Sequence, residues 1–188
     1  MSDIAILKEM IQETATVSLE NDLDGRNKVI LREPKPPNYY VTIYGMPDDD
    51  NVIIINADEF KSPDTIFKGN KDECKRADFI IIADTGKEKV ILCIEMKAGK
   101  GGSTTAQLQG AKCFVAYCRE IGQSFWNHSN FLKDYKLRFI SIKNITQKGK
   151  TRFDPRGIDP NQNLASKLKI LHRSGKSFEF NHLVHCQQ

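Results

Sequence analysis

Short β-branched apolar runs, separated by polar and turn-forming residues, dominate the pattern of this chain. Two of these runs, Phe79 to Ala83 and Val90 to Ile94, flank the five residues Asp-Thr-Gly-Lys-Glu at 84–88. The Asp and Gly of that linker suit a tight reversal, so the segment predicts a β-hairpin. If Asp84 pairs with Lys89 around a four-residue loop, the numbers of paired residues sum to 173.

Other runs predict the remaining elements. Strands are expected at Val29 to Arg32, Tyr39 to Tyr44, Val52 to Asn56 and Leu137 to Lys143. Residues 46–51 are expected to join the strands at 39–44 and 52–56 as a hairpin, and a C-terminal hairpin is expected at 168–173 and 177–184. Apolar residues at helical spacing predict helices over 3–20 and 104–119, the second with Ser103 or Thr104 as its N-cap. The order predicts one α/β domain over residues 1–188, with a mixed β-sheet flanked by helices.

The predicted register places acidic residues together. With a sum of 173, Asp78 lies directly opposite Glu95, on the same face of the sheet. Lys97 shares that face because strand side chains alternate. Two carboxylates so close repel each other unless a cation lies between them, and a slip of one residue would separate them.

The Glu-x-Lys pattern is weak evidence by itself because it occurs three times in this chain. Glu33-Pro34-Lys35 lies in a proline-rich loop, and Glu73-Cys74-Lys75 does not end an apolar run. Only Glu95-Met96-Lys97 ends a strand-like run and has an Asp at the matching register. This third copy is therefore the candidate site.

The helix after the hairpin adds polar candidates. Gln107 heads a stripe completed by Ala111, Phe114 and Cys118, whereas Gln109 heads a neighbouring line. We favour Gln107 as the residue near Glu95 and Lys97, with Gln109 as the alternative. Both glutamines could instead simply cap the start of the helix.

Ala77-Asp78, Glu95-Met96-Lys97, the glycine-rich turn at 99–103 and the following helix together resemble the PD-(D/E)xK superfamily of nucleases. That superfamily includes restriction enzymes, Holliday-junction resolvases and RecB-type nuclease domains. The resemblance covers about 40 residues. Ala77 stands where the pattern often has Pro, and the literal Pro63-Asp64 lies far upstream, which leaves Asp64 as an alternative to Asp78.

The resemblance implies a restriction-endonuclease-like fold and a Mg²⁺- or Mn²⁺-dependent phosphodiesterase, an endonuclease rather than an exonuclease. Asp78, Glu95 and the main-chain carbonyl of Met96 would bind metal, and Lys97 would orient water or stabilise the phosphorane. Gln107 corresponds to the glutamine that follows the Glu-x-Lys strand in such nucleases. A further acidic ligand often comes from the first helix, where Glu20 is favoured over Glu13 and Glu9. Cleavage would leave a 5′-phosphate and a 3′-hydroxyl, in restriction, defence or repair.

Charge is distributed unevenly along the chain. Residues 133–176 hold twelve Lys or Arg against three Asp, a charge of 12 − 3 = +9, within an overall net charge of +4. A basic C-terminal region favours a nucleic-acid partner, for which we expect DNA rather than RNA. The residues expected to contact phosphates lie in an exposed loop: Lys148, Lys150, Arg152 and Arg156.

The cysteines, and the lack of a predicted membrane span or signal peptide, predict a cytoplasmic protein. Its five cysteines form no Cys-x-x-Cys pair, as is typical of reduced cytoplasmic thiols. Neither a membrane span nor a signal peptide is predicted.

A nuclease with one active site would break both strands as a homodimer or by acting twice. The alternative function is a non-catalytic nucleic-acid-binding module with a nuclease-like fold.

Overall fold

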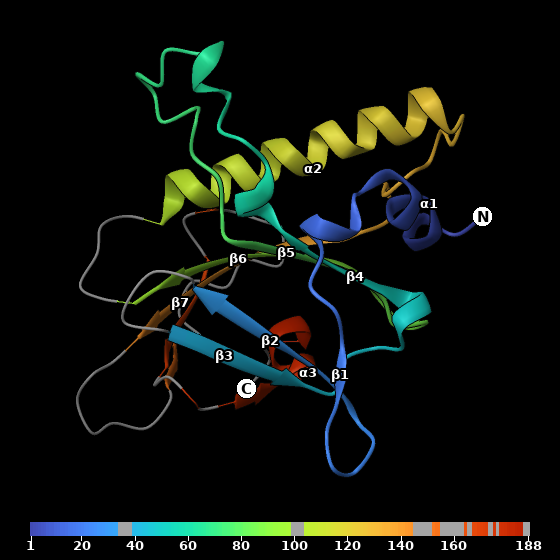
Figure 1. The fold of residues 1–188 in the computed structure, drawn as a ribbon, viewed down its shortest axis with the longest axis vertical. Coiled ribbons are helices and arrows are strands. Elements are labelled where there is room, and N and C mark those ends of the chain that lie inside the picture. The colour runs from blue at the N-terminus through green and yellow to red at the C-terminus, as the bar shows by residue number, and fades with distance from the viewer. Residues whose placement is uncertain are drawn as a thin grey trace.

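The computed structural model describes residues 1–33, 39–98, 104–144, 152–154, 164, 167–172, 175 and 177–185. They form two mixed β-sheets and a few helices (Figure 1). The larger sheet has six strands, in the spatial order β4 (Val52–Asn56), β5 (Phe79–Asp84), β6 (Lys89–Lys97), β7 (Lys136–Asn144), β9 (Leu168–His172) and β8 (Arg152–Asp154). The smaller sheet has the order β1 (Glu20–Asn21), β2 (Asn27–Glu33), β3 (Tyr39–Tyr44) and β10 (Ser177–Glu179).

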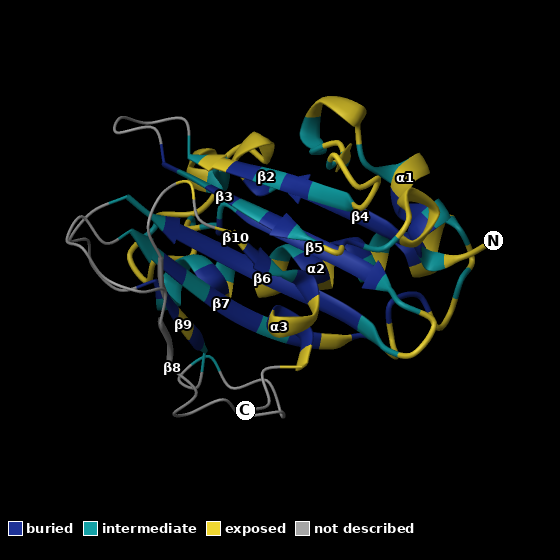
Figure 2. Ribbon diagram, turned by 90° about the horizontal axis from the view of Figure 1, so that it is seen from below, coloured by how far each residue is buried: buried dark blue, intermediate teal, exposed yellow. Residues whose placement is uncertain are grey.

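Both faces of the larger sheet are covered. One face packs against α1 (Asp3–Met10) and α2 (Thr105–Phe125), and the other packs against the smaller sheet and α3 (Phe180–His185). Figures 1 and 2 show these layers, with β5 and β6 buried along most of their length. The α/β prediction is therefore confirmed. A single sheet flanked by helices is wrong, because a second sheet takes the place of helices on one face.

The central strands show why β6 can hold a site. Residues Val90 to Met96 are all buried, as expected of a strand covered on both sides. Leu92 and Ile94 face the smaller sheet, and Cys93 faces the helices. By the same alternation Glu95 lies on the helix side, where a buried carboxylate requires compensation.

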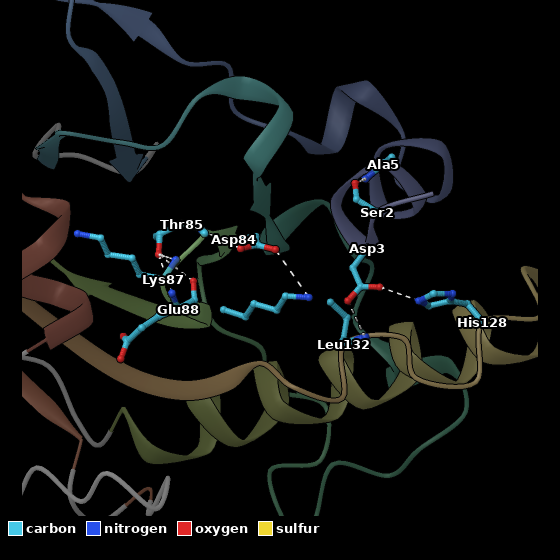
Figure 3. Close-up of polar contacts among 11 residues, drawn as sticks. Ser2, Asp3, Ala5, Asp84, Thr85, Lys87, Glu88, His128 and Leu132 are labelled. Atoms are coloured by element: carbon cyan, nitrogen blue, oxygen red, sulfur yellow. Dashed lines mark hydrogen bonds and ion pairs between the residues drawn. The ribbon is translucent and has the colours of Figure 1, made fainter.

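The β5–β6 hairpin is confirmed, and its turn is fixed by side-chain hydrogen bonds (Figure 3). Asp84 Oδ1 accepts from the amide of Gly86 at 2.9 Å. Thr85 Oγ1 accepts from the amides of Lys87 at 3.3 Å and Glu88 at 2.9 Å. Asp84 pairs with Lys89, as predicted, so the register sum is 173 along the whole hairpin.

Two other predicted hairpins are wrong. β3 pairs with β2, and β4 pairs with β5, so the loop between β3 and β4 connects the two sheets. At the C-terminus, β9 pairs in parallel with β7, whereas β10 pairs in parallel with β3. In both cases, adjacency in sequence suggested a local pairing, and partners distant in sequence displaced it.

The predicted N-terminal helix over 3–20 is too long. α1 ends at Met10, and the chain continues through a 3₁₀ turn (η1, Glu13–Ala15) into extended backbone. Thr16 forms a bridge with Ile55, and the amide of Val17 donates to the Ile54 carbonyl at 2.9 Å. The segment thus gives up helical hydrogen bonds to pair with the edge of β4.

The helix predicted over 104–119 is confirmed, with Thr104 at its N-cap position, and it extends further, to Phe125. Its buried face is formed by Leu108, Ala111, Val115, Cys118 and Gly122. The connection between β4 and β5, residues 57–76 and here called the arm, rises past this helix (Figure 1). The arm contains the 3₁₀ turns η3 (Ala57–Glu59) and η4 (Pro63–Thr65). Another 3₁₀ turn, η2 (Asp49–Asn51), lies outside the arm and directly precedes β4.

The arm touches α2 at Gly110. A Cβ placed there would lie 1.8 Å from the carbonyl oxygen of Lys75, so only glycine permits this approach. Phe60 also packs edge-on against Phe114, with ring centroids 5.3 Å apart. Among the described helices, none combines the length and apolar character needed to cross a membrane.

Candidate active site

The hairpin register brings Asp78 to Glu95. Phe79 pairs with Ile94, so the next position outward sets Asp78 beside Glu95, as predicted. The Asp78 side chain is fixed there because its Oδ2 accepts a hydrogen bond from the amide of Met96 at 2.6 Å. The main-chain carbonyl of Asp78 also accepts a hydrogen bond, from the Ala57 amide at 2.8 Å, which ties this corner to the start of the arm.

Lys97 completes the cluster. Its ammonium forms an ion pair with Glu95 Oε1, as the alternation of side chains along β6 predicted. The Glu95 side chain is only 1% exposed, whereas that of Lys97 is 27% exposed. Met96 lies between them, with its side chain in the opposite core.

These side chains line a cleft of about 550 Å³ between the end of the hairpin, the arm and the start of α2. Six of the lining residues are acidic, against the basic residues Lys75, Arg76 and Lys97. The full lining is Glu33, Asp58, Ser62, Asp64, Gly69, Asp72, Cys74, Lys75, Arg76, Asp78, Glu95, Lys97 and Gln107. An excess of carboxylates would repel a phosphate group unless cations offset it.

The structure distinguishes between the two glutamines. Gln107 lines the cleft, and its buried Oε1 has no hydrogen-bond partner within the described residues. Gln109 is exposed on the outer side of α2. Gln107 is therefore the glutamine that accompanies Glu95 and Lys97.

Three acidic residues of the cleft, Glu33, Asp58 and Asp72, were not predicted from the sequence. Glu33 ends β2, and its Oε2 is buried without a hydrogen-bond partner in the described part of the chain. The signal was present, since Glu33 ends an apolar strand, but the following prolines led to its exclusion. Asp58 lies directly after β4, in the turn η3, and forms an ion pair with Arg76 at 3.4 Å.

Glu20 is not part of this site. It lies in β1, is exposed, and pairs with Lys28 at 3.5 Å. It was expected at the end of a first helix over 3–20, and that helix ends ten residues earlier, at Met10. The alternatives from the same segment also lie elsewhere, because Glu13 lines a different groove and Glu9 accepts from the indole of Trp126 at 3.0 Å.

Asp64, the alternative to Asp78, lies on the exposed arm wall of the cleft. Asp78 is the residue at the register position opposite Glu95. The glycine-rich turn at 99–103 and the basic residues Lys148, Lys150 and Arg156 lie outside the described residues. The exposed loop predicted around Arg152 is wrong at that residue, because Arg152–Asp154 form β8 and pair with β9 at the edge of the larger sheet.

Burial perturbs the acidic pair. It raises the pKa of Asp78 to about 6, opposed by the hydrogen bond from Met96 and reinforced by the charge of Asp58. Burial, together with the neighbouring charge of Asp78, raises the pKa of Glu95 to about 8, although the Lys97 ammonium acts in the opposite direction. Ionisation of both carboxyls is therefore unfavourable unless a cation is bound between them.

The surroundings of Lys97 favour its charged form, whereas those of the two carboxyls favour their neutral forms. Burial disfavours its charged form, but the hydrogen bond with Glu95 and the charges of Glu95 and Asp78 outweigh burial and raise the pKa of Lys97. The ammonium therefore stays positive at neutral pH, beside two carboxyls.

The donor atoms suit a hard cation. Three buried oxygen atoms of this cleft have no hydrogen-bond partner among the residues that the structure describes: Glu33 Oε2, Glu95 Oε2 and Gln107 Oε1. Oxygen-only ligands are what Mg²⁺ and Mn²⁺ prefer. Within the described residues no group of three or more His, Cys, Asp or Glu side chains is arranged to hold a metal. A metal would thus rely on the Asp78 and Glu95 carboxylates, supplemented by carbonyl oxygen such as that of Met96.

Comparisons with family profiles, with curated proteins and with solved structures found no match for this chain. Its function must therefore be inferred from the residues of the cleft.

Proposed function

We propose that this chain is a Mg²⁺- or Mn²⁺-dependent nuclease that hydrolyses phosphodiester bonds, with DNA as its substrate. The observation that supports the proposal most is the arrangement of Asp78, Glu95 and Lys97. The buried carboxylate of Glu95, the half-buried carboxylate of Asp78 and one ammonium meet at the wall of an open cleft, and both carboxyls have raised pKa values. Such a combination is characteristic of functional sites rather than of stabilising ion pairs.

The metal would be held by the Asp78 and Glu95 carboxylates and the Met96 carbonyl. When bound, it would lower the pKa of an attacking water and neutralise charge on the phosphate. A bound cation would also relieve the repulsion between the two carboxylates, which otherwise disfavours their ionisation.

The protein itself would stabilise the phosphate charge, bind water or substrate, and hold Asp78 in position. Lys97 keeps its positive charge and forms an ion pair with Glu95. A phosphate held by a metal at Glu95 would therefore lie beside the Lys97 ammonium, which would stabilise the negative charge that develops on it. The unpaired Oε1 of Gln107 can accept a hydrogen bond from a water or a substrate group that enters the cleft. Met96 holds Asp78 in place through its amide.

The test is cleavage of single-stranded, duplex and branched DNA, and of RNA, with Mg²⁺ or Mn²⁺. Glu95→Gln and Lys97→Met should each lower the rate by about 100-fold or more, the usual loss when a charge-stabilising group is removed. Glu120→Gln and Lys112→Met change the same residue types on the exposed surface of α2 and should retain full activity. Products should carry a 5′-phosphate, and chelation should stop the reaction.

Cutting that survives Glu95→Gln would show that the activity arises elsewhere or from a contaminant. Binding of nucleic acid without cutting, in every metal tested, would replace this proposal with the non-catalytic module.

A further inference from the structure

The arm presents apolar side chains to solvent beside the cleft. Ile66 is 79% exposed and Phe67 is 53% exposed, at the turn that follows η4. Exposed apolar residues of this size, side by side on a protruding segment, are a common feature of binding surfaces. Figure 1 shows the arm standing clear of the sheets above α2.

The arm is structured by its own hydrogen bonds. The amides of Ile66 and Phe67 both donate to the Pro63 carbonyl, at 3.0 and 2.9 Å. Ser62 Oγ donates to the Cys74 carbonyl at 3.3 Å and so links the two limbs of the arm. A surface held in place before binding loses less conformational entropy when a ligand arrives.

The Glu73 carboxylate adds to this structure by accepting from the amides of Gly69 at 2.9 Å and Lys71 at 2.7 Å. Hydrogen bonds from the backbone amides of Glu73 itself, Lys71 and Gly69 lower the pKa of the Glu73 carboxyl. The arm thus presents a defined shape next to the carboxylates of the cleft.

Lysines flank the apolar pair, although the arm as a whole, residues 57–76, holds five Lys or Arg against five Asp or Glu, a charge of 5 − 5 = 0. Lys61, Lys68 and Lys71 are all exposed, and no ion pair to them is found among the described residues. Apolar surface with unpaired ammonium groups around it matches a ligand with flat faces and a phosphate backbone.

The same segment walls the cleft. Ser62, Gly69 and Cys74 of the arm line it together with Asp78 and Glu95. A strand whose phosphate reached Lys97 would therefore run past the arm. In a duplex the bases present only their edges, so an apolar side chain meets base faces where bases are unpaired or unstacked.

We propose that Phe67 stacks against an unpaired base and Ile66 packs beside it, with Lys61, Lys68 and Lys71 on the adjoining phosphates, so that the arm selects single-stranded nucleic acid. The inference deepens the proposed function, because it names the class of substrate that enters the same cleft. It depends on that function only for the position of the cut.

The test compares the binding of two probes by fluorescence anisotropy. One is a fluorescein-labelled thymidine oligonucleotide of about 20 nucleotides, longer than the roughly 4 to 16 that such sites cover. The other is a labelled hairpin duplex of similar charge. All proteins carry Glu95→Gln, with Mg²⁺ present, so that the probes stay intact.

Ile66→Ser combined with Phe67→Ser should weaken binding of the single strand by about fivefold or more, since stacking on one base contributes at least that much. Binding of the duplex should change less than about twofold. Phe125→Ser is the matched control, because Phe125 is 78% exposed at the far end of α2 and should have no effect. Lys68→Ser with Lys71→Ser should instead reduce the salt dependence of binding.

Three results would overturn the inference. The double variant could bind the single strand as tightly as its parent, or lose duplex and single-strand binding equally. Light scattering could show that the parent is a dimer and the double variant a monomer, which would make the arm a self-association surface. Cleavage by the otherwise unaltered chain, measured separately, decides the proposed function whichever of these results is obtained.

Discussion

Asp78 and Glu95 couple the stability of the protein to pH. Their ordinary pKa values of 3.8 and 4.5 apply in the unfolded chain, whereas burial raises them in the folded protein to about 6 and about 8. The folded state therefore binds protons more tightly than the unfolded state. The resulting stabilisation is complete below pH about 4 and is lost as pH rises, first through 6 and then through 8.

Replacing these carboxyls with amides should remove that loss. Without divalent metal, Asp78→Asn and Glu95→Gln should unfold at higher denaturant concentration than the wild type at pH 8.5, and the advantage should shrink at pH 5. Chemical denaturation with a chelator at both pH values measures this difference. Glu120→Gln, on the exposed surface, should follow the wild type at both. Parallel stability curves for all four proteins would mean that the pair ionises at ordinary pH.

Glu33 should contribute to cation binding. Its Oε2 is buried without a partner in the cleft, and its negative charge raises the pKa values of Asp78 and Lys97. Glu33→Gln keeps the shape and removes the charge, so Mn²⁺ affinity measured by calorimetry should fall by about 10-fold, the smaller loss seen when a residue near a metal is changed. Glu20→Gln should leave the affinity unchanged. Equal affinity in both variants would exclude Glu33 from the metal's surroundings.

Among the site residues, those that lie on one hairpin could be predicted from the sequence. Glu95, Lys97 and Asp78 lie on one hairpin, so their neighbourhood followed from the turn and from strand alternation. Glu33 and Asp58 reach the cleft from other elements, and no periodicity along the chain relates them to Glu95. Glu20 was misplaced because it depended on the length of a helix.

Among the elements, the same distinction separates correct from wrong predictions. The hairpin of β5 and β6 was correct because a tight turn with its own hydrogen bonds fixes which residues pair. The hairpin expected between β3 and β4 was wrong, because each strand found a better partner elsewhere in the chain. Pairing of β10 with β3 joins residues more than a hundred positions apart, which composition and spacing do not reveal.

Gly110 should be essential to the position of the arm. In an exposed helix, Gly→Ala normally stabilises by about 1 kcal/mol. Here the added Cβ would lie 1.8 Å from the Lys75 carbonyl oxygen, so the arm must shift, and we expect Gly110→Ala to destabilise by about 1 to 3 kcal/mol.

Denaturation midpoints measure the sign of this effect, and limited trypsin digestion should cut Gly110→Ala faster at the lysines of the arm. Gln109→Ala, one residue earlier on the exposed side of α2, should be close to neutral in both assays. Stabilisation by Gly110→Ala would show that the arm does not rest on the helix.

The molecule as a whole separates its charges. The cleft is acidic, with six carboxylates against three basic groups, whereas the overall net charge is +4 and residues 133–176 carry +9. A nucleic acid would thus be attracted by the basic region and by metal rather than by the cleft itself. The two-sheet core explains why such a cleft is tolerated, since the buried strands on both sides of β6 keep its carboxylates in place.

Removing charge from the basic region should weaken binding without regard to sequence or strandedness. Lys148→Ser, Lys150→Ser, Arg152→Ser and Arg156→Ser together lower the net charge from +4 to 4 − 4 = 0. If these groups bind phosphates, the logarithm of affinity should depend less steeply on the logarithm of salt concentration. The slope should fall by up to about 0.7 to 0.9 for each phosphate that is no longer neutralised.

The control removes the same charge outside the basic region, at the exposed residues Lys8, Arg32, Lys87 and Lys112. A general effect of net charge would weaken both quadruple variants alike and lower both salt slopes equally. Direct binding of phosphates by residues 148–156 requires a larger change in slope for their own variant. The two quadruple variants therefore separate long-range attraction by the whole molecule from binding at one segment, and the outcome decides whether the basic region guides nucleic acid or holds it.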